Sequence, residues 1–177
     1  MRWWESMSVR IKEYRGTYYS RKDLEEGRVM AFRDRPEARY AWATGVAMGR
    51  FLSELKNGRI IGRRCRSCGR VLVPPRMFCE RCFRPTDEWV YLSDTGTVLT
   101  YSVSYLGPAA ERLKEPVIIA VIQLDGASPG IGILHKLGEV KPEEVKIGMR
   151  VKAVWKPPEE REGAITDILY FKPIEEG

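Results

Sequence analysis

The stretch CRSCGRVLVPPRMFCERC, residues 65–82, contains all four cysteines of this 177-residue chain. They form two C-x-x-C pairs, Cys65 with Cys68 and Cys79 with Cys82, and ten residues lie between the pairs. A C-x-x-C turn places two sulfurs on one side of a metal while nearby backbone amides donate to the thiolates, and two such turns complete a tetrahedron. The stretch therefore predicts a four-cysteine metal site.

Zinc is the metal that this ligand set and spacing favour, although iron in a rubredoxin-like site has the same ligands. Two other interpretations are less favoured. Disulfides are typical of oxidising compartments, and a thioredoxin-like redox pair needs a single C-x-x-C at the start of a helix, whereas this chain has two such pairs. Four thiolates leave no open coordination position, so we expect a structural metal rather than a catalytic one. Such a site contributes on the order of 10 kcal/mol to folding, which a short ribbon does not gain from apolar burial.

Arginines surround the cysteines. Residues 59–84 contain eight arginines and a single acid, Glu80, whereas residues 94–177 contain more acidic than basic side chains. Guanidinium groups offset the negative charge of a zinc tetrathiolate and donate hydrogen bonds to its sulfurs, and those that project outward form a basic face. The charge pattern thus predicts arginines that stabilise the metal site and others that are free for a phosphate group.

Two helix signals precede the cysteines and predict a helical arm over residues 1–58. Ser20, followed three residues later by an acid, is a capping-box-like start for a helix over residues 21–32. A second helix is predicted from the signals at residues 34–37 to Asn57-Gly58, where glycine suits a left-handed cap. Its predicted apolar face consists of Tyr40, Ala43, Ala47, Phe51 and Leu55.

Gly45 and Gly49 lie four residues apart on this second predicted helix. Small residues at this spacing predict a shallow groove that another backbone can approach. Packing within this chain and docking to a partner protein are the two interpretations of that groove.

After residue 93 the hydrophobic pattern changes to a period of two. Runs typical of strands occupy residues 96–106, 115–126, 130–138, 148–157 and 164–174. Five short antiparallel strands in about eighty residues fit an OB-type barrel. We therefore expect a mainly β protein with N-terminal helices: a helical arm over 1–58, a zinc ribbon over 59–93 and a five-stranded barrel over 94–177.

The sequence contains no convincing catalytic set. His135 is the only histidine, and a histidine within a strand is more often a packing residue than a catalyst. No apolar run approaches the roughly 20 residues of a membrane span, and the N-terminus lacks the apolar stretch of a secretory signal, so we expect a cytoplasmic protein. Asn57 and Gln123 are the only side-chain amides, a bias associated with thermophilic proteins.

Nucleic-acid binding is the alternative function. Zinc ribbons and OB-type barrels bind single strands through basic grooves and stacked aromatic side chains. The net negative charge of residues 94–177 weakens this interpretation, because phosphate contacts supply most of the nonspecific affinity.

Residues 40–83, YAWATGVAMGRFLSELKNGRIIGRRCRSCGRVLVPPRMFCERCF, followed by a five-strand pattern, resemble a known family. It is the family of OB-fold proteins with a rubredoxin-like zinc ribbon that accompany acyl-CoA enzymes. The most specific elements are the two C-x-x-C pairs with Val73-Pro74-Pro75-Arg76 between them, and Ile147-Gly148-Met149 before the fourth strand.

The resemblance implies an accessory subunit of thiolase-like enzymes. In archaea, such proteins bridge an acetoacetyl-CoA thiolase and a hydroxymethylglutaryl-CoA synthase at the start of the mevalonate route. Bacterial relatives pair with thiolases, hydratases or aldolases that act on acyl-CoA, and in each case the partner carries the catalytic residues. Coenzyme A or an acyl-CoA shared with the partner would bring phosphate groups near the arginine-rich ribbon, and Arg76 is the first candidate for a phosphate contact.

Overall fold

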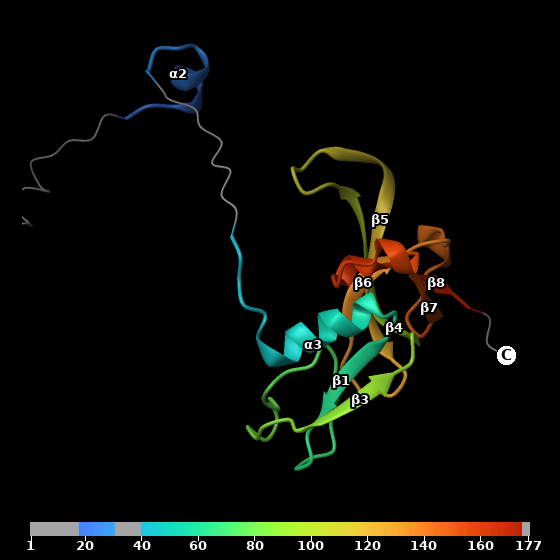
Figure 1. Ribbon diagram of the computed structural model, residues 1–177. Helices are drawn as coiled ribbons and strands as arrows, with labels where there is room; N and C mark the ends of the chain where they lie inside the picture. The colour runs from blue at the N-terminus through green and yellow to red at the C-terminus, as the bar shows by residue number, and fades with distance from the viewer. Residues whose placement is uncertain (1–17, 31–39, 175–177) are drawn as a thin grey trace, which may run out of the picture. The chain divides into compact units, whose positions relative to one another are not determined.

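The computed structural model describes residues 18–30 and 40–174 (Figure 1). The chain divides into two units, one that ends at Ala41 and one that begins at Trp42, and each is described by itself. In the part of the chain that is described, no helix combines the length and the apolar character that crossing a membrane requires.

The first unit contains the short helix α2, Arg21–Glu25. The predicted capping box is confirmed, because the Asp23 amide donates to the Ser20 hydroxyl and the Ser20 amide donates to the Asp23 carboxylate. The prediction that this helix continues to residue 32 is wrong. It ends at Glu25 because Gly27 adopts a φ of 69°, a left-handed conformation that a right-handed helix does not contain.

The second unit begins with helix α3, Gly45–Lys56. The start signals predicted for this helix at residues 34–37 lie outside the described residues. Tyr40 and Ala43, predicted on its apolar face, lie before the helix, which starts only at Gly45, where φ is 69°. The rest of the prediction is confirmed: Ala47, Phe51 and Leu55 are buried, and the helix ends before Asn57-Gly58.

No other backbone segment of the described chain packs against the groove predicted at Gly45 and Gly49. A Cβ added at Gly45 would meet nothing within 4 Å, and one added at Gly49 would meet only the Thr44 hydroxyl, at 3.1 Å. The structure thus gives no support to packing of this pair within the chain, and docking to a partner stays a prediction.

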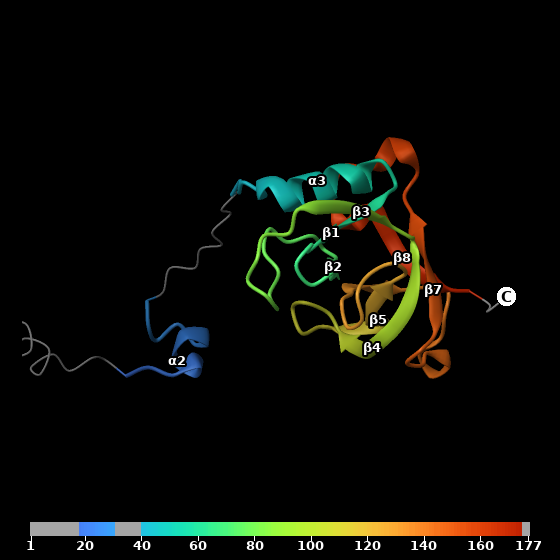
Figure 2. The same cartoon turned by 90° about the horizontal axis from the view of Figure 1, so that it is seen from below.

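A three-stranded antiparallel sheet follows α3 and forms the ribbon. Its strands are β1, Ile60–Arg64, β2, Val71–Leu72, and β3, Glu88–Leu92, in the order β2-β1-β3. Helix α3 contacts β1 and runs alongside β1 and β3 (Figure 2). The two loops that leave this sheet, between β1 and β2 and between β2 and β3, carry the four cysteines.

The remaining strands close into the predicted five-stranded barrel. They are β4, Thr95–Leu106, β5, Arg112–Leu124, β6, Ile133–Leu137, β7, Arg150–Trp155, and β8, Ile168–Pro173, in the closed order β4-β5-β6-β8-β7. Three short 3-10 helices, Pro142–Glu144, Pro158–Glu160 and Ile165–Asp167, lie in the connections. The expectation of purely antiparallel pairing is wrong for one pair, because β6 and β8 run parallel where Leu137 meets Phe171.

One hydrophobic core extends through the second unit. Phe51 and Leu55 of α3 and Ile60 of β1 belong to the same buried cluster as barrel residues such as Val98 and Ile122. The ribbon sheet is therefore fixed to the barrel by apolar packing, and the metal loops project from a firmly held base. The predicted boundaries of the ribbon and the barrel stay a prediction.

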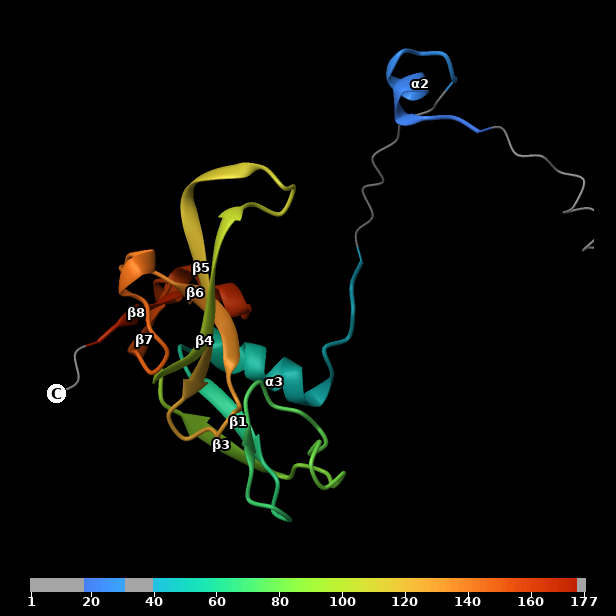
Figure 3. The same cartoon turned by 180° about the vertical axis from the view of Figure 1, so that it is seen from behind.

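The outer half of the β4–β5 hairpin extends away from the barrel (Figures 1 and 3). Burial changes along β4 in the same way: Val98 is fully buried, whereas Tyr101, Tyr105 and Leu106 are exposed. The extended hairpin thus presents apolar side chains outside the core.

Candidate metal centre

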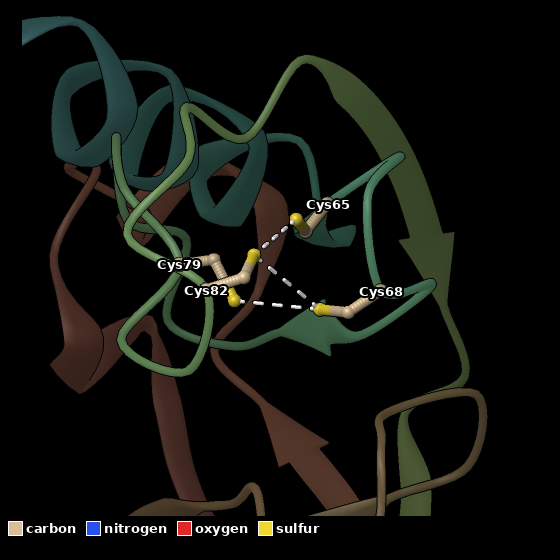
Figure 4. A group of neighbouring side chains, drawn as sticks. All are labelled: Cys65, Cys68, Cys79 and Cys82. Carbon is tan, nitrogen blue, oxygen red and sulfur yellow. Dashed lines mark hydrogen bonds between the residues drawn. The ribbon is translucent and has the colours of Figure 1, made fainter.

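The fold brings the four cysteine sulfurs into one cluster (Figure 4). All four Sγ atoms lie within 4.8 Å of one another. The Sγ atom of Cys82 is 3.3 Å from that of Cys65 and 3.9 Å from that of Cys68, and the Sγ atoms of Cys68 and Cys79 are 3.5 Å apart. Zn–S bonds of about 2.3 Å place tetrahedral sulfurs roughly 3.8 Å apart, so the cluster fits zinc without rearrangement of the backbone.

The first pair lies on a tight turn, which we call the first knuckle, residues 65–70. The Gly69 amide donates to the Cys65 carbonyl at 2.7 Å, and the Cys65 amide donates to the Arg70 carbonyl at 2.8 Å. Gly69 adopts a φ of 74°, a left-handed conformation that glycine takes without a steric penalty.

The second pair lies on an equivalent turn, the second knuckle, residues 79–84. The Phe83 amide donates to the Cys79 carbonyl, and the Cys79 amide donates to the Arg84 carbonyl, both at 2.9 Å. Phe83 occupies the position of Gly69 and also has a positive φ, 52°. The two turns therefore repeat one backbone geometry on opposite sides of the sulfur cluster.

The electrostatics of the cluster call for a cation. The amides of Cys82 and Arg81 donate to the Cys79 sulfur and lower the pKa of that thiol to about 7. The Arg70 amide favours the Cys68 thiolate, yet burial and the neighbouring sulfurs raise the pKa of the Cys68 thiol to about 11. Thiolates at these separations repel one another, so four of them can coexist only around a positive ion.

Burial makes this a closed site. Cys65 and Cys79 have no exposed surface, and Cys68 and Cys82 are half-buried. With four protein ligands and no open coordination position, a metal bound here stabilises the loops rather than taking part in a reaction.

Arg63 has a structural role that sequence reasoning missed. Its side chain is buried, donates from Nη2 to the Thr86 carbonyl and from Nη1 to the Met77 sulfur, and lies 4.6 Å above the Trp89 ring. The Thr86 hydroxyl in turn donates to the Arg76 carbonyl. Arg63 thereby connects β1 to both ends of the loop that carries the second cysteine pair.

Most of the other ribbon arginines pair with acids. Arg70 of the first knuckle and Glu80 of the second lie 2.6 Å apart. Arg64 pairs with Glu88, the first residue of β3, and Arg66 pairs with the preceding Asp87. Across residues 18–30 and 40–174, no arginine guanidinium donates a hydrogen bond to a cysteine sulfur, contrary to our expectation; Arg70 and Arg81 contact the sulfurs through their backbone amides. The arginines instead link the two knuckles to each other and to the sheet.

Arg76, the candidate phosphate contact, lies on the loop between the two cysteine pairs. Its side chain is 57% exposed, and its Nη1 atom lies 3.7 Å from the Glu80 carboxylate. It borders a cavity of about 400 Å³ whose other lining residues come from the β2–β3 loop and from α3 with the residue before it. Nothing in this environment fixes its role, so the phosphate contact stays a prediction.

His135 packs inside the barrel, in agreement with the packing role that the sequence favoured. The side chain is 9% exposed, and its ring lies edge-on to the Phe171 ring, with 5.6 Å between the ring centroids. Its Nδ1 atom accepts a hydrogen bond from the Lys136 amide at 2.9 Å. Burial lowers the pKa of the imidazole and so favours the neutral ring.

Comparisons with known proteins agree with this architecture. Residues 52–88 match the family described as "ChsH2, rubredoxin-like zinc ribbon domain", and residues 89–156 match "ChsH2, C-terminal OB-fold domain". The fold and the cysteine site thus define a class of protein, a zinc ribbon joined to an OB-fold barrel.

Two relatives are named DUF35 domain-containing scaffold proteins. The one from Methanocaldococcus jannaschii is 41% identical over 119 residues, 66% of this chain and 82% of the relative. The one from Pyrococcus furiosus is 32% identical over 118 residues, 66% of this chain and 84% of the relative. The chain belongs to the DUF35 scaffold-protein family.

The solved structures that are similar to this one include the following two. A DUF35 protein of unknown function from Sulfolobus solfataricus is 33% identical, with a TM-score of 0.52 over 63% of this chain and 79% of that chain. The Ltp2-ChsH2(DUF35) aldolase is 23% identical, with a TM-score of 0.53 over 78% of this chain and 98% of that chain. The second likeness shows the fold alone.

Proposed function

We propose that this protein is a non-catalytic, zinc-containing scaffold of a cytoplasmic acyl-CoA enzyme complex. In that complex it bridges an acetoacetyl-CoA thiolase and a hydroxymethylglutaryl-CoA synthase of the mevalonate route. The observation that carries the proposal is the closed four-cysteine site on a member of a scaffold-protein family. A metal with four protein ligands organises a surface and leaves the chemistry to a partner.

The environments of His135 and of the cysteines support a scaffold over an enzyme. His135 is buried, its Nδ1 atom accepts from the Lys136 amide and its Nε2 atom lies 3.3 Å from the Ile165 carbonyl, so both ring nitrogens already have backbone partners. The cysteines, which would otherwise be the best nucleophiles, are expected to be metal ligands. The catalytic residues would then belong to the partner enzymes.

Bridging has a physical rationale. Formation of acetoacetyl-CoA by a thiolase is thermodynamically uphill, so the next enzyme must remove the product efficiently. Holding the two enzymes close raises the effective concentration of the intermediate for the favourable second step. A small protein with a rigid ribbon and an extended hairpin offers two separate surfaces for this purpose.

The proposal is tested by reconstitution. We expect the full chain, mixed with the thiolase and the synthase from the same genome, to elute as one complex whose mass requires all three proteins. The thiolase and the synthase without this chain should elute separately, which is the control. A lone monomer in the presence of both enzymes would refute the proposal.

Within this complex, we assign Arg76 to a phosphate group of coenzyme A. Its exposed guanidinium beside the cavity of about 400 Å³ could receive the anion, with the Glu80 carboxylate 3.7 Å away as its present partner. We expect Arg76→Ala to raise the Kd of coenzyme A for the assembled complex about ten-fold, measured by calorimetry. Arg66→Ala, which removes an exposed ribbon arginine paired with Asp87, is the matched control. If complexes that contain Arg76→Ala and Arg66→Ala bind coenzyme A with the same Kd, this contact is excluded.

A further inference from the structure

The second knuckle contains a phenylalanine where the first contains glycine. Phe83 and Gly69 both follow a C-x-x-C pair, and both donate from the backbone amide to the first cysteine of that pair. Both residues have a positive φ, 52° and 74°. In this conformation a Cβ atom crowds the backbone, so glycine is the residue that the turn itself prefers.

Packing of the Phe83 ring within the described chain does not offset the unfavourable backbone conformation of this residue. The Phe83 side chain is 85% exposed, and two more apolar side chains of the same loop, Phe78 at 62% and Met77 at 42%, are exposed as well. A β-bridge between Phe78 and Pro85 closes the loop, so these residues lie on one short, metal-clamped hairpin. A strained backbone that displays an unpacked aromatic ring indicates a functional constraint rather than a folding one.

Two arginines without ion pairs in the described chain lie close to Phe83 in the sequence. Arg81 and Arg84 have no ion pair within residues 18–30 and 40–174, whereas Arg70 and Arg76 share Glu80. An exposed phenylalanine between two free guanidinium groups fits a partner surface with an apolar recess and acidic residues around it.

We propose that residues 77–85 form a docking surface for an acidic patch on a partner enzyme, with the Phe83 ring as its anchor. This inference rests on the proposed scaffold function and specifies the surface that the scaffold uses. The metal holds the hairpin in one conformation before binding, so little conformational freedom is lost when the ring enters its recess.

A protein partner fits these residues better than a single-stranded nucleic acid. Stacking on Phe83 and phosphate contacts from two arginines are compatible with a nucleic acid, but such binding relies on a longer basic groove. Here, apolar side chains continue the surface on the N-terminal side, and the other described ribbon arginines except Arg63 are paired with acids.

The test is Phe83→Gly in the full chain, assembled with the thiolase and the synthase. We expect the Kd for the enzyme that contacts the knuckle to rise about thirty-fold, as for an interface hot spot. Zinc content should remain at the wild-type level, and the melting temperature should equal or exceed that of the wild type, because glycine relieves the positive φ. Phe83→Tyr, which keeps the ring, should bind like the wild type.

Each other outcome overturns the inference in a recognisable way. If the wild type binds neither enzyme, the scaffold function and the docking surface both fail. If the wild type and Phe83→Gly bind equally well, only the docking surface fails. If Phe83→Gly loses zinc or melts at a lower temperature, the ring is structural. If the variant loses only salt-sensitive binding to single-stranded DNA, the surface belongs to a nucleic acid.

Discussion

Replacement of Cys79 by serine is expected to release the metal and to unfold the loops of the ribbon. Cys79 is fully buried, and its sulfur lies 3.5 Å from that of Cys68, so serine replaces a thiolate of the cluster by a neutral hydroxyl, a much weaker zinc ligand. A structural zinc site contributes on the order of 10 kcal/mol, and we expect loss of one ligand to remove most of that stabilisation. Elemental analysis should give less than one zinc per chain, and thermal unfolding should begin at a lower temperature.

The control for this prediction is Ser67→Ala. Ser67 lies between the two cysteines of the first knuckle, is exposed and supplies no ligand, so zinc content and melting temperature should stay at wild-type values. A chelator should reproduce the effect of Cys79→Ser in the wild type, because both treatments remove the same ion. A Cys79→Ser variant that keeps one zinc per chain and the wild-type melting temperature would contradict the assignment of this residue.

The metal site was predictable because its signal is local. Two C-x-x-C pairs fix four sulfurs through turn geometry, so the spacing in the sequence determines the cluster. The five strands of the barrel were also predictable, because alternation of apolar residues is a property of each strand alone. The parallel contact of β6 with β8 was not, because it depends on how the barrel closes.

The side chains that the sequence did not reveal act through distant partners. Arg63 is one of eight arginines in its segment, and only the fold buries it against Trp89. In the same way, Arg150 of β7 forms a two-pronged ion pair with Asp125, at 2.8 and 2.6 Å, next to the intervening strand β4, whose Thr97 hydroxyl also accepts from Arg150. The hydrogen bonds from Arg150 lower the pKa of Asp125 to about 2. Neither pairing follows from residue type or spacing, because the partners meet only in the folded chain.

The second knuckle shows the same limit in another form. Its two cysteines predict a turn, but the positive φ of Phe83 is visible only in the structure. The sequence therefore predicts the metal site, and the structure identifies the residue that departs from the requirements of that site. Such a departure is where a functional constraint is most readily detected.

Phe51→Ala is expected to destabilise the ribbon and the barrel together. Phe51 is 1% exposed and lies in the core cluster that joins α3, the ribbon strands and the barrel. Truncation of a buried phenylalanine typically costs about 3–5 kcal/mol, through lost burial and the cavity left behind. Because one core serves all three parts, zinc release and loss of barrel structure should shift to lower temperature by the same amount.

Two probes recorded in one thermal scan measure this coupling: a chromogenic zinc indicator for the ribbon, and far-ultraviolet circular dichroism for the strands. Ser53→Ala is the matched control, because Ser53 lies exposed on the same helix. Alanine favours the helical conformation, so both midpoints should remain at or above those of the wild type. Coincident midpoints that fall together in Phe51→Ala would mean that residues 59–93 and 94–177 unfold as one cooperative unit. Separate midpoints, with only one of them lowered, would instead show that the predicted ribbon and barrel are independent domains, and the shared core would then contribute little to their coupling.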